Sequence, residues 1–145
     1  MTIQVIVKQT AALTSLELLA ILKERVKVFV VEQQCLYQEV DDDDNQAYHV
    51  MLMENQQIVG YSRIMVSPDG VRFGRVLVPK AQRHRNLGRQ LVATTLAEIK
   101  QRFPGQPVKI GAQNYLRTFY ESFGFKATSA VYLEDDIPHI DMLLN

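Results

Sequence analysis

The stretch that decides the fold is RVLVPKAQRHRNLGR, residues 75–89. It begins as an apolar strand, which we expect over residues 71–78, passes through a polar and basic loop, and enters an amphipathic helix expected over residues 87–103. An apolar run at residues 108–112 then predicts a second strand. Residues 71–112 therefore form a β-α-β unit, in which the two strands should be parallel.

Further strands and helices are predicted on both sides of this unit. Strand patterns occur at residues 2–7, 49–53, 58–65, 131–133 and 140–144. Thr14 and Glu17 form a capping box that begins a first helix, which we expect to end near Val30. A shorter helix follows the second strand of the unit and ends at Gly124. The sequence thus predicts one mixed α/β domain, residues 1–145, around a twisted and mostly antiparallel sheet with one parallel pair.

The composition excludes several classes of protein. The chain has 145 residues, of which 47% are hydrophobic and 22% charged, values typical of a single globular domain. Its 16 Lys and Arg balance 16 Asp and Glu, which argues against a nucleic-acid or membrane-surface binder. This balance hides six acids without a base at residues 32–44 and six bases without an acid at residues 72–89. With one cysteine, no signal-peptide pattern and no apolar run of about 18 residues, we expect a cytoplasmic protein.

The loop and helix start at residues 79–89 predict an anion site. The free N–H groups of the first helical turn converge there, and the helix dipole adds partial positive charge, which suits a phosphate or diphosphate. Gly88 permits a ligand to approach closely, and Asn86 tolerates a left-handed backbone conformation. Arg83, Arg85 and Arg89 supply charge at the rim. Taken alone, the segment is equally compatible with a solvated basic helix start.

Two motifs carry a resemblance to a known family. Arg83-x-x-Asn86-x-Gly88 resembles the Arg/Gln-x-x-Gly-x-Gly/Ala signature of the GCN5-related N-acetyltransferases (GNAT proteins), and Tyr120-x-x-x-Gly124-Phe resembles their Tyr-x-x-x-Gly-Phe segment. Residues 28–35, 111–113 and 136–140 are similar to a narrower bacterial subgroup, the ElaA-like acetyltransferases. The resemblance runs from about residue 16 to residue 144, with the motifs in the family's order.

Two positions depart from the family pattern. Asn86 stands where the signature has its first Gly. An Asn often lies seven residues before the tyrosine, but this chain has Gln113 there and Asn114 one position later. Either of these two side chains is a candidate for contacting the pantetheine arm of coenzyme A (CoA).

The resemblance implies a GNAT fold and transfer of an acetyl group from acetyl-CoA to a primary amine of a small molecule or peptide. The amine would attack directly in a ternary complex, without a metal. The strand at Val76, Leu77 and Val78 would splay from its parallel neighbour and bind the pantetheine arm, with the N–H near Leu77 polarising the thioester carbonyl. The diphosphate would lie on Arg83, His84, Arg85, Asn86, Leu87, Gly88 and Arg89.

Tyr120 is the candidate for stabilising the departing sulfur. Complete proton transfer from a phenol to a thiolate is uphill by about 2 kcal/mol, so we expect a hydrogen bond rather than full donation. Because Tyr120 lies on the apolar face of its helix, a role in the core alone is the alternative.

The acceptor amine needs a base, because only about 1 in 2,500 alkyl amines is neutral at pH 7. Some family members have a Glu on the strand before the loop, but Phe73, Gly74 and Arg75 offer no carboxylate. The remaining candidates are Glu32, His49 and His139. The alternatives are a surface carboxylate for Glu32 and a hydrogen-bonded structural residue for His49.

The acidic run, the single cysteine and the basic cluster at residues 83–85 are weaker candidates for a functional site. The run Asp41 to Asp44 lacks the Gly and Glu that an EF-hand needs at positions 6 and 12, so we interpret it as a solvated loop, with attraction of a cationic acceptor as the alternative. Catalysis by Cys35 and nucleic-acid binding at residues 83–85 are disfavoured. The main rival to an enzyme is a non-catalytic acyl-CoA sensor of the same fold. For assembly, we expect pairing of sheet edges into a homodimer.

Overall fold

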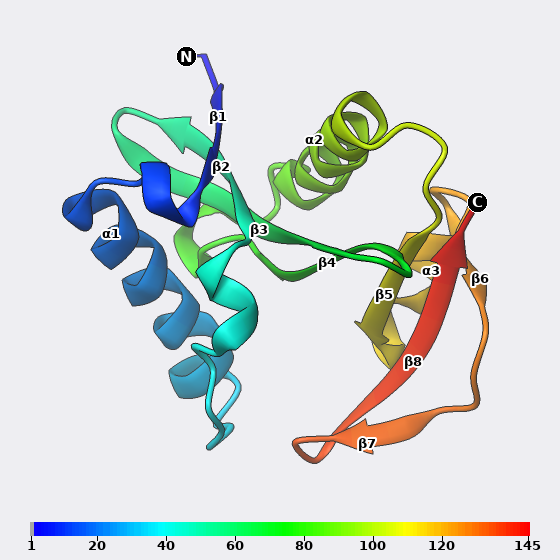
Figure 1. Ribbon diagram of the computed structural model, residues 1–145. Coiled ribbons are helices and arrows are strands. Elements are labelled where there is room, and N and C mark those ends of the chain that lie inside the picture. The colour runs from blue at the N-terminus through cyan, green and yellow to red at the C-terminus, as the bar shows by residue number, and fades with distance from the viewer. Residues whose placement is uncertain (1) are drawn as a thin grey trace.

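The computed structural model describes residues 2–145 and contains one sheet of eight strands (Figure 1). The strand order is β1-β2-β3-β4-β5-β8-β6, and β7 pairs with β8. The strands are β1 (Gln4–Gln9), β2 (Tyr48–Glu54), β3 (Gln57–Ser67), β4 (Gly70–Leu77), β5 (Val108–Gln113), β6 (Lys126–Ala127), β7 (Tyr132–Glu134) and β8 (Ile137–Leu144). Among the described residues, only β4 and β5 pair in parallel. The predicted mixed α/β fold is confirmed.

Helix α1 (Ser15–Arg25) begins with the predicted capping box. The Thr14 hydroxyl accepts a hydrogen bond from the Glu17 N–H at 3.1 Å, and the Glu17 carboxylate accepts one from the Thr14 N–H at 2.8 Å. The end of this helix differs from the prediction. The α-helix stops at Arg25, and a π-helical segment (Val26–Glu32) continues it beyond Val30. Apolar spacing alone does not distinguish such a π-helical segment from the end of an α-helix.

Helices cover both faces of the sheet. Helix α2 (Leu87–Arg102) and helix α3 (Arg117–Glu121) lie on one face, and α1 lies on the other (Figure 1). Strand β2 shows the alternation that makes this possible, because Val50 and Leu52 join the core under α2 whereas Met51 joins the core under α1. Gly124 ends the last helical segment with φ of +100°, as its position after α3 predicts.

The parallel pair β4–β5 is short and then splays. Only Val71–Val108 and Arg72–Lys109 are paired, although both strands continue beyond these positions. On its other side, β4 carries one extra residue relative to β3, a bulge in which Arg75 has φ of +49°. Bulges bend the strand that carries them, and the pairing of β4 with β5 already ends at Arg72, before this bulge. The expected splayed pair is therefore present.

The acidic run is not simply a solvated loop. Asp42 and Asp43 are exposed as expected, but Asp44 is buried. The fully buried Arg25 donates to Asp44 at 2.6 Å, and Arg63 donates to Asp41 at 2.7 Å. The prediction is wrong for these two residues because their partners come from α1 and β3, far away in the sequence.

Candidate functional site

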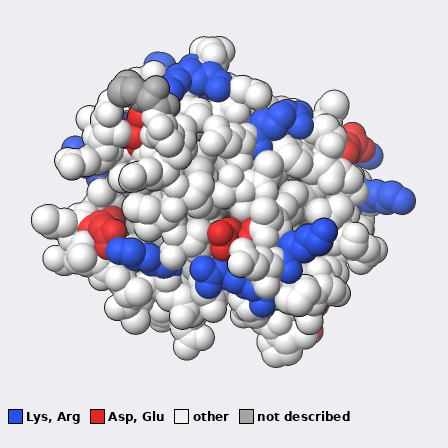
Figure 2. Space-filling model, turned by 90° about the horizontal axis from the view of Figure 1, so that it is seen from above, with Lys and Arg blue, Asp and Glu red and all other residues white. Residues whose placement is uncertain are grey.

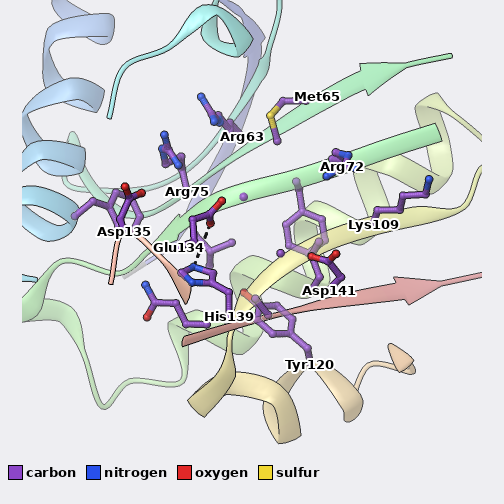
Figure 3. Close-up of a pocket in the computed structure, with 18 of the residues that line it drawn as sticks. Arg63, Met65, Arg72, Arg75, Lys109, Tyr120, Glu134, Asp135, His139 and Asp141 are labelled. Carbon is purple, nitrogen blue, oxygen red and sulfur yellow. Dashed lines mark ion pairs between the residues drawn. The ribbon is translucent and has the colours of Figure 1, made fainter. Parts of the chain in front are cut away.

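A cavity of about 260 Å³ opens where β4 and β5 separate (Figure 3). Three of the predicted site residues line it together: Tyr120, Val76 and Gln113. His139, named from the sequence as a candidate base, lines it as well. The other polar or charged lining residues on the strands include Arg72, Arg75, Lys109, Tyr132, Glu134 and Asp141.

Tyr120 belongs both to the core and to the pocket. It is 5% exposed, and its ring packs edge-on against Phe119 and Phe125 at centroid distances of 5.1 and 6.0 Å. Burial raises the pKa of Tyr120, so the phenol keeps its proton at neutral pH. The packing fixes the ring, and the phenol is held as a hydrogen-bond donor in the wall of the pocket.

His139 and Glu134 point toward each other across the pocket (Figure 3). The His139 Nε2 atom lies 3.5 Å from Glu134 Oε2. The other ring nitrogen, Nδ1, is 2.7 Å from the carbonyl oxygen of Ile137. The ring also stacks on Tyr132, with centroids 6.1 Å apart and an interplanar angle of 25°. These contacts come from β7 and β8.

The loop before α2 has the geometry of an anion cradle. A short 3-10 turn (Lys80–Gln82) is followed by two residues with left-handed backbone, His84 at φ of +67° and Asn86 at φ of +61°. Asn86 is the N-cap of the 16-residue helix α2. A Cβ added at Gly88 would meet no atom within 4 Å, so the first turn is open to a ligand. This loop and the open gap beside β4 fit a diphosphate with an extended arm.

The loop arginines have partners that the sequence did not reveal. Arg83 pairs with Glu32 at 2.6 Å, and Arg85 pairs with Glu54 at 2.8 Å. Arg89 lies over the ring of Phe123 at 4.9 Å, which ties α2 to the segment after α3. Arg83 and Arg85 thus form ion pairs at the edge of the loop, whereas Arg89 packs on an aromatic ring and helps to hold α2 in place.

The structure does not bring Glu32 or His49 to the pocket that contains Tyr120. Glu32 ends the π-helical segment, and its hydrogen bond with Arg83 lowers its pKa, which makes it a weak base. His49 is fully buried between Tyr61 Oη at 2.6 Å and Thr10 Oγ1 at 2.7 Å. Burial lowers the pKa of His49 to about 4. His49 is thus a hydrogen-bonded structural residue, as the alternative prediction had it. The ion pair with Arg83 disfavours Glu32 as the base.

Cys35 lines the pocket without the surroundings of a nucleophile. Its thiol lies 3.4 Å from the carbonyl oxygen of Asp135, and burial raises its pKa. Asn114 begins a short 3-10 turn after β5 and does not line the pocket. Of the two candidates for the pantetheine contact, Gln113 is therefore the better placed.

The charged lining residues were missed by sequence reasoning. Glu134 and Asp141 lie on β7 and β8, and Arg72 and Lys109 are paired neighbours at the closed end of the splay. The one available signal was the acidic run at residues 134–136 shortly before His139. Its meaning depends on the pairing of β8 with β5, which places His139 beside Gln113.

On the face seen from above, Lys and Arg side chains do not gather into one separate basic patch (Figure 2). Figure 2 shows Lys and Arg side chains spread over the face seen from above, with Asp or Glu beside several of them.

Within residues 2–145, none of the helices has the length and hydropathy of a membrane-spanning segment.

Comparisons with known proteins agree with this geometry. A family model described as an acetyltransferase (GNAT) domain matches residues 16–145. Protein ElaA of Escherichia coli K12 is 44% identical over 131 residues, which cover 87% of this chain and 86% of that protein. The crystal structure of Escherichia coli ElaA superposes with a TM-score of 0.93 at 40% identity, covering 98% of this chain and 99% of the other. The crystal structure of an acyl-CoA N-acyltransferase from Pseudomonas aeruginosa gives the same TM-score and coverage at 39% identity. The chain belongs to the GNAT acetyltransferase family and is ElaA-like.

Proposed function

We propose that the protein is an N-acetyltransferase that transfers an acetyl group from acetyl-CoA to a primary amine of a small molecule or peptide, by direct attack in a ternary complex. The observation that carries the proposal is the position of Tyr120, which lines the gap where β4 and β5 separate. A phenol there lies beside the place where an extended thioester would reach. The relative described as an acyl-CoA N-acyltransferase supports the donor class.

Strand β4 is assigned the pantetheine arm. Beyond Arg72 the edge of β4 that faces β5 has no strand partner, so an extended ligand can add to it as a further strand would. We assign this contact to Val76, Leu77 and Val78, with Gln113 facing them from β5. The N–H near Leu77 would polarise the thioester carbonyl and stabilise the developing oxyanion.

The diphosphate is assigned to residues 83–89. Both side chains of the Arg83–Glu32 pair are about one-third exposed, and surface pairs contribute only about 0–1 kcal/mol. A diphosphate can therefore replace the carboxylate of Glu32 at little cost, whereas the Arg85–Glu54 pair, in which the Glu54 side chain is only 10% exposed, is harder to replace. The open first turn at Gly88 and the left-handed residue Asn86 would let the backbone N–H groups reach the phosphate oxygens.

The test follows free-thiol release from acetyl-CoA across a panel of primary amines. Tyr120→Phe should lower kcat about ten- to a hundredfold and leave the KM for acetyl-CoA nearly unchanged, because it removes a hydrogen bond to the leaving sulfur. Tyr48→Phe is the matched control, since Tyr48 packs on Phe103 and does not line the pocket.

Each outcome discriminates between functions. Normal turnover by Tyr120→Phe would contradict the role of the phenol. Tight binding of acetyl-CoA without turnover on any amine would favour the non-catalytic acyl-CoA sensor. Absence of CoA binding would exclude both the acetyltransferase and the acyl-CoA sensor.

A further inference from the structure

The far half of the sheet has one polar face. In β5, Val108, Ile110 and Ala112 enter the core under α2, so Lys109, Gly111 and Gln113 face the opposite side. Strand β8 continues this face, with Asp141 beside Gly111 and His139 beside Gln113. These residues line the pocket, together with Tyr120. His139 therefore belongs to this polar face of β5 and β8, which we call the floor of the pocket.

The hydrogen bonds of His139 decide which ring nitrogen is available. The Ile137 carbonyl oxygen, 2.7 Å from Nδ1, can only accept, so Nδ1 must carry a proton. In the neutral imidazole the lone pair is then on Nε2, the nitrogen turned toward Glu134. The ring is held by its stacking on Tyr132, and the side chain is 11% exposed. His139 thus presents a fixed basic nitrogen to the pocket.

Glu134 completes a two-point receptor for an N–H group. Its Oε2 lies 3.5 Å from His139 Nε2, which is longer than a normal hydrogen bond, and its side chain is 59% exposed. An ammonium between the two groups can donate one hydrogen bond to each. When Nε2 takes up a proton, the carboxylate stabilises the resulting imidazolium.

The neighbouring acid Asp141 is already engaged. The Tyr132 hydroxyl donates to its Oδ1 at 2.6 Å, and Gly111 leaves the space for this contact, since an added Cβ would lie 3.3 Å from that hydroxyl oxygen. Tyr132 therefore links two fixed parts of the floor, the carboxylate of Asp141 and the ring of His139. The open carboxylate beside the free Nε2 is that of Glu134.

We propose that His139 is the base that accepts the proton of the acceptor amine and that Glu134 is a positioning residue for the amine and for the imidazolium. This inference rests on the proposed acetyl transfer. His139 Nε2 first removes a proton from the bound ammonium, which frees the lone pair of the amine nitrogen, and this nitrogen then forms a bond to the thioester carbonyl carbon. The C–S bond breaks and its electron pair goes to sulfur; Tyr120 donates a hydrogen bond to the leaving thiolate, which takes up the second proton lost by the nitrogen. The products are an amide, CoA as the free thiol and a protonated His139 that returns its proton to solvent.

The kinetic test uses His139→Asn, because the Asn amide can keep the donor to Ile137 while Nε2 is lost. With an alkyl amine at pH 7, kcat should fall at least about a hundredfold, with the KM for acetyl-CoA unchanged. With methoxyamine, which is already neutral at pH 7, the loss should be at least tenfold smaller. Such selectivity for the protonated amine is not expected from a structural defect.

Glu134→Gln should raise the KM for the alkyl amine and lower kcat, whereas the control Glu98→Gln, in an exposed pair with Arg102 on α2, should change neither. Equal losses of the His139 variant with both amines, or full activity, would overturn the assignment.

Nitrogen NMR of the imidazole rings tests His139 without an acceptor. The chain has three histidines, so the signals can be assigned by single substitutions. Neutral His139 should carry its proton on Nδ1, and a proton on Nε2 would overturn the proposal. If the wild type acetylates no amine, the proposed function fails and the inference with it. If the wild type is active but either His139 result is contrary, the inference alone fails.

Discussion

His49 and His139 both lie on strands of the same sheet, yet their surroundings make them chemically different. His49 on β2 is fully buried, and both ring nitrogens have side-chain partners, Thr10 and Tyr61. His139 on β8 has one nitrogen bonded to a backbone carbonyl and the other open to the pocket. The position of a histidine in a strand therefore does not reveal whether it is structural or catalytic; its neighbours in the fold decide that.

The buried His49 should make stability depend on pH. Its pKa is lowered to about 4 by burial, compared with about 6.5 in the unfolded chain, so the unfolded state binds the extra proton between these values. This contribution to stability is fully present above about pH 6.5 and is lost as the pH falls toward 4, by about 3 kcal/mol in total. Urea unfolding of the wild type and of His49→Gln at pH 7, 6 and 5 measures this contribution. The difference between the two proteins in the free energy of unfolding should become smaller as the pH falls. An equal difference at all three pH values would refute the prediction.

At the scale of elements, the junction between β4 and α2 is the most informative part of the chain. The strand, the bulge at Arg75, the loop and the first turn of α2 together form the proposed CoA cradle. Asn86 takes the left-handed conformation that Gly adopts most easily, as its place in the family signature suggests. The departure from the signature therefore preserves the backbone shape.

Substitutions of Asn86 should separate backbone shape from side-chain chemistry. Asn86→Ala should cost about 1 kcal/mol of stability and weaken acetyl-CoA binding, because Ala is strained at positive φ. Asn86→Gly should retain both properties within error. Urea unfolding and calorimetric titration with acetyl-CoA provide the measurements. Equal weakening of binding in both variants would mean that the Asn side chain itself contacts the ligand.

At the scale of the whole molecule, the neutral net charge reflects internal pairing. The acidic stretch at residues 32–44 and the basic stretch at residues 72–89 contact each other directly, through Arg75 with Glu39 and through Arg83 with Glu32. Part of the acidic stretch thus holds the loop against the sheet and is not available to attract a cationic acceptor. In the pocket, Glu134 is the carboxylate better placed for that role.

Arg25 connects this network to α1. Its guanidinium pairs with Glu39 at 3.0 Å and with Asp44 at 2.6 Å, and it is fully buried. Arg25→Met removes the fully buried partner that Glu39 and Asp44 share and leaves them only their contacts with Arg75 and Arg63, so it should cost about 3–5 kcal/mol in urea unfolding. Arg102→Met, which removes an exposed pair with Glu98, is the control and should cost less than about 1 kcal/mol. Similar losses in both variants would contradict a structural role for the network.

The sequence predicted those features that depend on neighbours along the chain. The alternation of residues 49–53, the capping box at Thr14 and Glu17, and the strand-loop-helix motif at residues 75–89 are all set by residues within a few positions of one another. The roles of Tyr120 and of the strand at residues 76–78 came from the resemblance to the family, and they stay predictions. Local reasoning overlooked the π-helical end of the first helix, whose spacing resembles that of an ordinary helix.

Tertiary structure alone decided which charged groups remain available for chemistry. Glu32 is paired with an arginine 51 positions away, and Asp44 with one 19 positions away. His139 reaches the pocket, which Tyr120 from α3 also lines, because β8 pairs with β5. The reactivity of an ionisable side chain depends on its burial and on the charges within a few ångströms, and folding brings those neighbours from distant parts of the chain.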